Sequence, residues 1–315
     1  MKMRNVTITA IGSYLPPRIM TNDELAAIVD TSDEWITSHT GIRTRSIAEG
    51  ETTSEMAIKA TENLIKRFKT DPKRIDGVIV ATATSDYPGF PSTANLVSRH
   101  FKTSGGAFDV AAGCTGFIYA LDVARSMILS GTLKNALVIG SETLSTVIDW
   151  EDRNTCVLFG DGAAAVLLEQ VASGGLSPAL LKSESEQAGS LTIDPASRHI
   201  TMDGKAVYQF AVRAIGKIVT DVLKANNLSI SEIDWIVPHQ ANRRIISATS
   251  KRYGIPEELF YLNIERVANT SAASIPLALS EMETGCLLKE GQKILLVGFG
   301  AGLTYGGSLV TWHRS

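Results

Sequence analysis

Cysteine is scarce in this sequence, with only Cys114, Cys156 and Cys286 among 315 residues. The three are odd in number, far apart and never in a Cys-x-x-Cys pair, which argues against both a disulfide framework and a zinc site. We therefore expect free thiols, no bound metal and a protein of the reducing cytoplasm.

Long hydrophobic runs are also missing. No uninterrupted apolar stretch approaches the roughly 18 to 20 residues that a membrane-spanning helix requires. The first segment alternates Val6, Ile8 and Ala10 with other residues and lacks the apolar core of a signal peptide. It predicts a first β-strand, and we expect no membrane partner.

Neither sign of charge dominates, since 30 basic and 33 acidic residues give a net charge of -3. This balance argues against the basic field that nucleic-acid binding usually needs, so we expect no nucleic acid as a partner. Hydrophobic residues make up 44% of the chain, which is typical of a globular protein with a large core. A charged partner would have to bind a local patch.

The chain resembles itself at a shift of about half its length. RIDGVIVATAT, containing Asp76, matches EIDWIVPHQAN, containing Asp234, and LKNALVIG, containing Lys134, matches QKILLVG, containing Lys293. The two pairs are separated by 158 and 159 residues. We expect a duplicated α/β unit with halves 1–172 and 173–315, joined through the Gly- and Ser-rich residues 171–178.

Continuous apolar runs predict strands that are buried on both faces, at residues 77–84, 107–113, 136–140, 234–239 and 293–300. They alternate with helix-period segments, so the fold class is α/β with parallel or mixed sheets. Two such units would share a helical layer between their sheets. Catalytic groups in this architecture collect at strand ends and helix starts.

Cys114 lies at such a junction, between the predicted strand 107–113 and a helix, with Gly113 and Gly116 close by. A helix N-terminus favours thiolate over thiol, and glycine permits a sharp elbow, so the motif favours a nucleophile of lowered pKa. The alternative is a small buried apolar residue. Cys156 and Cys286 lack this setting, and we interpret both as structural.

Three further features fit a catalytic centre but are individually weak. His239 follows a buried run, although a histidine there is often only structural. Asn269 precedes a segment of small residues, where it could simply cap a helix. The glycine-rich loop 298–307 could supply oxyanion-hole amides or bind phosphate.

Together the motifs AAGCTGF, GDGAAAVLL, VPHQAN, ANTSAAS and FGAGLTYGGSLV, in this order, resemble β-ketoacyl-acyl carrier protein (ACP) synthase III of the thiolase superfamily. The resemblance extends over nearly the whole chain. It implies a five-layered αβαβα fold, a homodimer and a Cys-His-Asn triad, which falls on Cys114, His239 and Asn269. It also implies an oxyanion hole formed by the amides of Cys114 and Ala301.

The activity implied by this resemblance is a decarboxylative Claisen condensation that initiates fatty acid synthesis. Cys114 takes a short acyl group from acyl-CoA, and malonyl-ACP then loses CO2 to an enolate that His239 and Asn269 stabilise. The products are CoA, CO2 and 3-oxoacyl-ACP, with no cofactor beyond the CoA thioester substrate. An alternative is a related acyltransferase of secondary metabolism that uses an unusual acyl donor, and a non-catalytic scaffold is a third reading.

Binding residues also follow from the resemblance. It places CoA or pantetheine contacts on Trp35, Arg153, Tyr208, Asn242 and Arg244. Docking of ACP is expected on Arg244, Lys251 and Arg252, whose spacing puts them on one helix face. Phe90 is expected in the acyl pocket across the dimer interface, where its ring favours a short primer such as acetyl.

Two positions depart from the family pattern. His39 occupies a position where arginine is common, which would weaken the expected grip on CoA phosphate. Ala301 replaces a glycine in the oxyanion loop, where its methyl group narrows the available space. Both departures leave the alternative acyl donor open.

Overall fold

Two β-sheets form the frame of the protein in a computed structural model that describes residues 5–103, 105–172 and 174–313. The first sheet has the order β1 (Asn5–Tyr14), β7 (Gly162–Val171), β6 (Asn135–Glu142), β4 (Val78–Ala81) and β5 (Ala107–Val110). The second has the order β12 (Trp235–Pro238), β13 (Lys293–Gly300), β14 (Thr304–Thr311) and β8 (Gly175–Leu176), and β9 (Leu180–Ser183) also pairs with β14.

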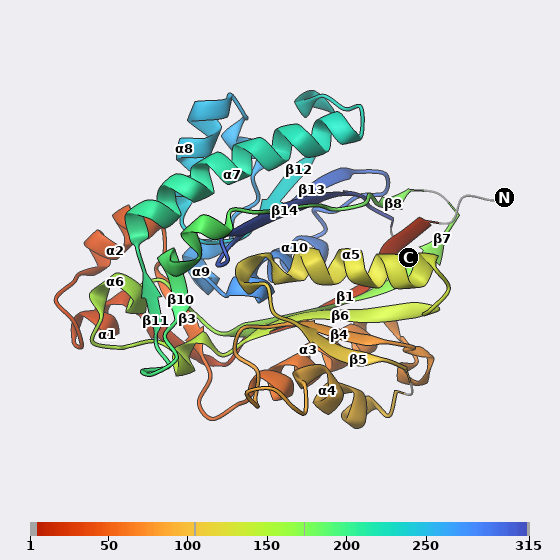
Figure 1. The fold of residues 1–315 in the computed structure, drawn as a ribbon, viewed down its shortest axis with the longest axis horizontal. Coiled ribbons are helices and arrows are strands. Elements are labelled where there is room, and N and C mark those ends of the chain that lie inside the picture. Colours follow the sequence, from red (N-terminus) through yellow and green to blue (C-terminus); the bar gives the residue numbers. More distant parts are fainter. Residues whose placement is uncertain (1–4, 104, 173, 314–315) are drawn as a thin grey trace.

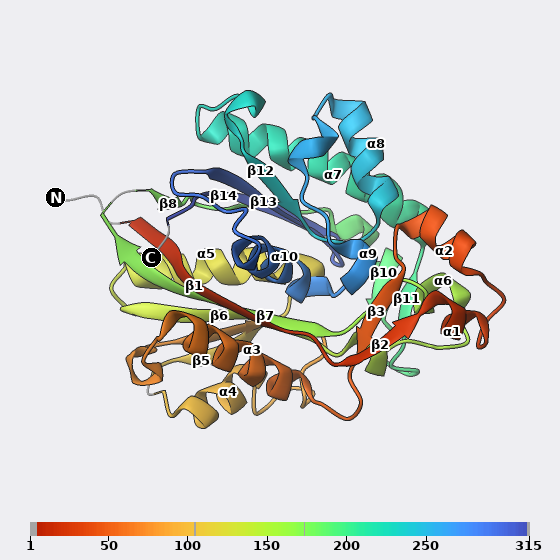
Figure 2. The same ribbon diagram turned by 180° about the vertical axis from the view of Figure 1, so that it is seen from behind.

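Helices form three layers around these sheets (Figure 1). The outer face of the first sheet is covered by α3 (Thr53–Phe68) and α4 (Thr93–Phe101), and α5 (Gly116–Leu129) and α10 (Ser274–Thr284) lie between the sheets. On the far side α7 (Gly204–Ala225) packs on the second sheet beside α8 (Arg243–Tyr253). The same five layers are seen from behind in Figure 2, and they confirm the αβαβα arrangement expected from the family resemblance.

The remaining short elements gather mainly at one end of the layers, at the left of Figure 1. They are β2 (Arg18–Thr21), α1 (Asn22–Ala26), α2 (Asp33–Thr40), β3 (Thr44–Ile47), α6 (Arg153–Cys156), β10 (Leu191–Ile193), β11 (Ile200–Met202) and α9 (Ile264–Val267). Within the described ranges, no helix combines the length and the apolar character needed to cross a membrane.

The apolar runs form buried strands because helices cover both faces of each sheet. Every residue of β4 and β6 is buried, and β4 pairs in parallel with β5 and β6, as β12 does with β13. The prediction was wrong for β5, which is only half-buried because it is an edge strand with β4 as its single partner. Its Asp109 faces the start of α4 and accepts hydrogen bonds from the Thr93 and Ala94 amides at 2.7 and 2.8 Å.

The two halves contain matching features, in agreement with a duplicated unit. Asp76 Oδ2 accepts a 2.8 Å hydrogen bond from the Lys134 amide, and Asp234 Oδ2 accepts one of the same length from the Lys293 amide. Each helix of the middle layer also begins after a 3₁₀ turn, Gly113–Thr115 before α5 and Ser271–Ala273 before α10.

The division into two domains stays a prediction. Along the chain, β7 is the last strand of the first sheet and ends at Val171, and β8 is the first strand of the second sheet and begins at Gly175. Residue 173 of the expected join lies outside the described residues. Because α5 and α10 share one layer, the two halves are packed closely against each other. This packing brings residues from both halves to one site.

Candidate active site

Cys114 lies at an elbow between β5 and α5, as the sequence predicts. The elbow is the 3₁₀ turn Gly113–Thr115, in which Gly113 adopts a φ of +50° that favours glycine. Gly300 approaches so closely that a Cβ atom there would lie 2.7 Å from Cys114 Cβ. These two glycines allow the turn and the end of β13 to approach each other at the Cys114 sulfur. Cys114 itself is buried, with 7% of the residue exposed.

The loop after β13 places a backbone donor beside this sulfur. The amides of Ala301 and of Cys114 itself both form hydrogen bonds that favour the ionised sulfur. The side chain of Thr115 holds the loop in place, since its Oγ1 donates to the Thr304 carbonyl at 3.1 Å. Two backbone amides therefore lie at the Cys114 sulfur.

His239 follows the end of β12, in the second half of the chain. Its amide donates to the Val297 carbonyl at 2.7 Å, which extends the β12–β13 pairing by one residue. The imidazole Nδ1 lies 2.7 Å from Ser274 Oγ, and the ring packs edge-on against Phe299. Burial lowers the pKa of His239 to about 3, so the ring is neutral at neutral pH.

Asn269 is fixed through its backbone to the first half of the chain. Its amide donates to the Leu158 carbonyl and its carbonyl accepts from the Gly160 amide, both at 3.0 Å. Its side-chain Oδ1 accepts a 2.9 Å hydrogen bond from the Ser271 amide, which resembles the capping role that the sequence allowed. Since Oδ1 is engaged in this way, the Nδ2 amino group is the end of the side chain left to donate to a substrate.

All three expected triad residues line one cavity of about 100 Å³. The cavity continues past apolar side chains to Tyr208 and Asn242 on α7 and at the start of α8. A second cavity of about 320 Å³ meets Cys114 from another side. Its lining is mainly apolar: Ala83, Ala111, Gly113, Leu144, Phe159, Leu191, Thr192, Ile193, Ile200, Ser271 and Ala301. We refer to the first cavity as the tunnel and to the second as the apolar pocket, and Cys114 lines both.

The expected low pKa of Cys114 is wrong. The pKa of the thiol is raised to about 11, mainly by burial and in smaller part by the nearby charge of Glu142. Hydrogen bonds from Ser271 and from the Ala301 and Cys114 amides act in the opposite direction but do not outweigh burial. The resting cysteine is therefore a protonated thiol at neutral pH and needs a base to become a nucleophile.

Sequence reasoning missed three buried polar residues around this site: Glu142, Ser271 and Ser274. Glu142 accepts hydrogen bonds from Thr84 Oγ1 at 2.6 Å and from the Ala83 amide at 3.0 Å, and burial raises its pKa. The only sequence signal for the serines was their position in ANTSAAS, directly after Asn269. Nothing in that segment indicated that Cys114 and His239 would pack against it.

The residues expected to bind CoA form a connected group near the tunnel. The Arg153 guanidinium lies 4.3 Å from the centre of the Trp35 ring, and His39 stacks on the same indole at 4.4 Å. Asn242 Nδ2 donates to the His39 carbonyl at 3.0 Å. If the adenine of CoA stacked between Trp35 and Arg153, the two side chains would have to be about 7 Å apart, which is twice the usual stacking distance. Because they are 4.3 Å apart, Arg153 would have to move when CoA binds.

Most of the remaining expected residues are exposed. Arg244, Lys251 and Arg252 are exposed on α8, whereas half-buried Tyr208 donates a 3.4 Å hydrogen bond from its hydroxyl to the Arg244 carbonyl. These three basic side chains form no ion pair with the described part of the chain. Phe90 is 92% exposed and lines neither cavity at Cys114, so its expected role would require a second subunit.

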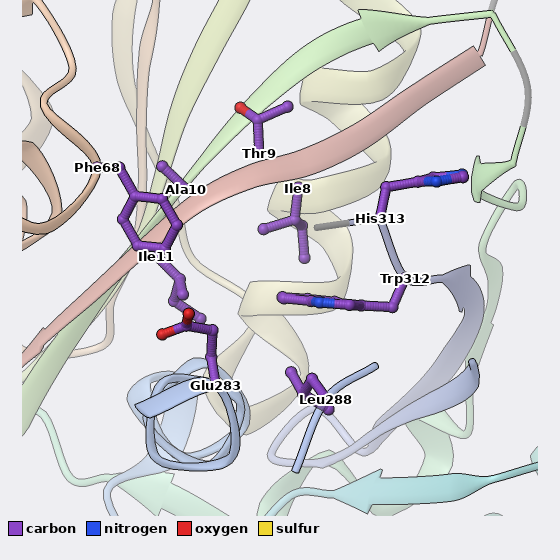
Figure 3. Close-up of a pocket in the computed structure, with 9 residues that line it drawn as sticks. All are labelled: Ile8, Thr9, Ala10, Ile11, Phe68, Glu283, Leu288, Trp312 and His313. Carbon is purple, nitrogen blue, oxygen red and sulfur yellow. The ribbon is translucent and has the colours of Figure 1, made fainter. Parts of the chain in front are cut away.

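A further cavity lies away from Cys114, between β1, the end of α10 and the residues after β14 (Figure 3). Its volume of about 10 Å³ leaves room for no more than about one water molecule. The Glu283 carboxylate at its edge forms an ion pair with Arg67. No cysteine lines this cavity, and within the described residues no group of three His, Cys, Asp or Glu side chains could hold a metal ion.

Alkylation should report the state of the Cys114 thiol. In a Cys286→Ser variant, which lacks the exposed cysteine, we expect the rate of iodoacetamide reaction at Cys114 to rise steadily from pH 7 towards pH 10. The thiolate is the form that reacts with iodoacetamide. Because the pKa of the thiol is raised to about 11, the fraction of thiolate increases throughout this pH range. Mass spectrometry of the modified peptide gives the rate, and a rate that is flat above pH 7 would instead indicate a lowered pKa.

Comparison with known proteins identifies the family. Residues 108–185 match the family model "3-Oxoacyl-[acyl-carrier-protein (ACP)] synthase III", and residues 223–312 match the model of its C-terminal part. The β-ketoacyl-ACP synthase III of Paramagnetospirillum magneticum is 49% identical, over 96% of this chain and 98% of its own. That of Clostridium beijerinckii is 44% identical, over 98% and 100%.

Comparison with a solved structure indicates the same family. The crystal structure of 3-oxoacyl-ACP synthase III from Aquifex aeolicus superposes with a TM-score of 0.94 at 43% identity, covering 98% of this chain and all of that one. Its fold is thus shared throughout the length of both chains. The protein described here belongs to the β-ketoacyl-ACP synthase III family.

Proposed function

We propose that this protein condenses a short acyl group from acyl-CoA with malonyl-ACP, and so forms 3-oxoacyl-ACP, CO2 and CoA as the first condensation of fatty acid synthesis. The observation that carries this proposal is the convergence of Cys114, His239 and Asn269 on one cavity, with a separate apolar pocket on another side of the sulfur. A tunnel and a pocket that share a nucleophile fit a substrate arm and an acyl chain.

In the first half-reaction the Cys114 sulfur attacks the acyl-CoA carbonyl. The neutral imidazole of His239 lines the same cavity and can take up the thiol proton, which a cysteine of raised pKa does not release by itself. The amides of Cys114 and Ala301 stabilise the tetrahedral oxyanion. The C–S bond to CoA then breaks, and the proton passes from His239 to the departing sulfur, so CoA leaves as a thiol and the acyl group stays on Cys114.

In the second half-reaction the malonyl group loses CO2, and the electron pair of the broken C–C bond forms an enolate on the thioester. Asn269 Nδ2 donates a hydrogen bond to the enolate oxygen, and Nε2–H of the neutral His239 ring is the second donor. The enolate carbon attacks the acyl-Cys114 carbonyl and expels the sulfur, which takes up a proton from solvent and returns to the thiol. Because decarboxylation generates the nucleophilic carbon, the reaction needs no redox or metal cofactor.

Substitutions at Cys114 and Asn269 should separate the two half-reactions. Cys114→Ala removes the nucleophile, so mass spectrometry should detect no acyl-enzyme with acetyl-CoA. Asn269→Ala keeps the nucleophile and removes one enolate donor, so we expect near-normal acylation but condensation slowed by about 100-fold. Undiminished transfer by Cys114→Ala would refute the proposed nucleophile, and equal loss of both steps in Asn269→Ala would refute the assigned role of Asn269.

The acidic carrier protein is proposed to dock on α8. Arg244, Lys251 and Arg252 are exposed, lie on one face of this helix and form no ion pair within the described residues. Asn242, at the start of the same helix, lines the tunnel that leads to Cys114. A carrier protein bound to this face would hold its pantetheine arm near the tunnel.

Charge reversal should test this surface. We expect Lys251→Glu with Arg252→Glu to raise KM for malonyl-ACP by about tenfold at low salt, with little change in kcat, because steering weakens while the site is intact. The matched control is Lys134→Glu with Lys289→Glu, which also reverses the charge of two exposed basic residues, just before β6 and on the loop after α10. An equal rise in KM in the control, or no dependence on salt, would contradict docking on α8.

The molecule is proposed to act as a homodimer in which Phe90 reaches the acyl pocket of the other subunit. Phe90 and Tyr87 are large apolar side chains that the single chain leaves 92% and 49% exposed. Such exposure of neighbouring aromatic residues is typical of a surface that another chain covers. A bulky ring at the end of the pocket would favour a short primer.

Phe90→Ala should therefore extend the range of primers. We expect the ratio of octanoyl-CoA to acetyl-CoA turnover to increase about tenfold or more, since the shorter side chain lengthens the pocket. Leu287→Ala, which truncates an exposed apolar residue on the loop after α10, should leave the ratio unchanged. A monomer by analytical ultracentrifugation, or an unchanged primer profile in Phe90→Ala, would overturn the proposal.

The three cysteines are free, which supports action in the reducing cytoplasm.

The names of the relatives favour fatty acid synthesis over the secondary-metabolism alternative. The primer profile also distinguishes the two. Highest turnover with an unusual acyl donor would favour that alternative.

A further inference from the structure

The residue that follows His239 is a buried glutamine whose side-chain amide is fully engaged. Gln240 is 1% exposed, and its Nε2 donates to the Pro238 carbonyl at 2.9 Å and to the Tyr261 carbonyl at 3.1 Å. Its Oε1 accepts a 3.2 Å hydrogen bond from the Asn263 amide. Both hydrogens and the oxygen of this carboxamide are therefore bonded to main-chain groups.

The side chain of Gln240 takes the place of a strand residue. The segment that contains Tyr261 runs beside β12, where the Tyr261 amide donates to the Ile236 carbonyl at 2.9 Å. Ile236 also forms a parallel bridge with Phe260. Beyond the end of β12, the Gln240 carboxamide bonds to the Tyr261 carbonyl and to the amide two residues later. A residue of a parallel strand pairs with the same combination of groups, so Gln240 continues the pairing where the strand stops.

This contact links the two expected hydrogen-bond donors to the malonyl enolate. His239 directly precedes Gln240. On the other side, Asn263 is followed at once by α9, and the Val267 amide of this helix donates to the Asn263 carbonyl at 3.3 Å. Asn269 lies two residues beyond α9. A shift of Gln240 relative to Asn263 would therefore change the separation of the two donors.

The two half-reactions depend on this separation to different degrees. In acylation the imidazole of His239 acts alone on the thiol proton. In decarboxylation His239 and Asn269 donate to one enolate oxygen, so both must lie within hydrogen-bond distance of the same atom. A misplacement of about 1 Å can slow such a step about 100-fold, although both donors are still present.

We propose that Gln240 is a positioning residue that sets the separation of His239 and Asn269, and so supports decarboxylation of the malonyl group more than loading of the acyl group. This inference rests on the roles proposed above for His239 and Asn269. Gln240 lines neither the tunnel nor the apolar pocket. It therefore acts only through the two segments that it joins.

The hydrogen bonds of Gln240 can be tested in the unmodified enzyme. The sequence has five glutamines, all within the described residues, and Gln240 is the single buried one. In protein labelled with ¹⁵N at glutamine side chains, we expect one amide group to exchange its hydrogens with D2O at least about 100-fold more slowly than the other four. Loss of this signal in Gln240→Met assigns it. Similar exchange of all five groups would overturn the proposal.

Gln240→Met tests the effect on the two half-reactions, because it keeps the length of the side chain and removes the amide. We expect condensation with malonyl-ACP to slow by about 10- to 100-fold, with acylation by acetyl-CoA within about threefold of wild type and little change in KM. Gln240→Glu should show the same split, since a carboxyl group cannot supply both hydrogens that the Pro238 and Tyr261 carbonyls accept. Mass spectrometry of the acyl-enzyme and release of labelled CO2 from malonyl-ACP measure the two steps.

Asn135 offers a matched control at the opposite end of β6 from Glu142. Its buried carboxamide also joins a carbonyl to the amide two residues later. Nδ2 donates to the Arg74 carbonyl at 2.7 Å, and Oδ1 accepts from the Asp76 amide at 2.9 Å. Asn135→Leu should therefore lower the unfolding temperature as Gln240→Met does, without changing the ratio of condensation to acylation.

Several results would refute this role of Gln240. They are a wild-type ratio of condensation to acylation in Gln240→Met, an equal slowing of both steps, or an equal change of the ratio in Asn135→Leu. If Gln240→Met does not fold, the ratio in Gln240→Glu and the wild-type exchange rates decide. Failure of the proposed function is distinct, since it appears as acyl transfer by Cys114→Ala.

Discussion

The contact between two turns in the middle helical layer is the constraint on which the rest of this site depends. The turn Gly113–Thr115 carries the sulfur at the start of α5, and the turn Ser271–Ala273 lies against it at the start of α10. The second turn also packs tightly on the first sheet, because a Cβ atom on Gly140 of the central strand β6 would lie 2.3 Å from the Ala272 carbonyl oxygen. Small residues along ANTSAAS are what let these backbones approach.

Burial has two opposite effects on the reactive pair. It raises the pKa of the Cys114 thiol and lowers that of the His239 imidazole, because both charged forms lose their hydration. The resting pair is therefore neutral, and its reactivity depends on where hydrogen atoms lie instead of on a preformed thiolate. Hydrogen bonds from Ser271 and from the Ala301 and Cys114 amides favour the ionised sulfur, but they do not outweigh burial.

Much of the fold was open to prediction from sequence. The apolar runs around Val78 and Leu295 and the glycines beside Cys114 are local signals, and they correctly indicated buried strands and an elbow. The order of the strands is not local, so the position of β5 at an edge was missed. The pKa of Cys114 was wrong because the helix N-terminus is visible in sequence, whereas the burial that outweighs it arises from segments far along the chain.

The candidate site divides in the same way. The family motifs indicated Cys114, His239 and Asn269, and the fold brings them to one cavity, but the sequence contained no sign that Ser274 would meet His239 across 35 positions of the chain. Amino-acid order alone determined the elements, the thiol, the imidazole and the carboxamide, because these follow from residue type and short-range pattern. Tertiary packing alone decided the protonation of the pair, the hydrogen bond to Ser274 and the two cavities at the sulfur, because each depends on atoms that only folding brings together.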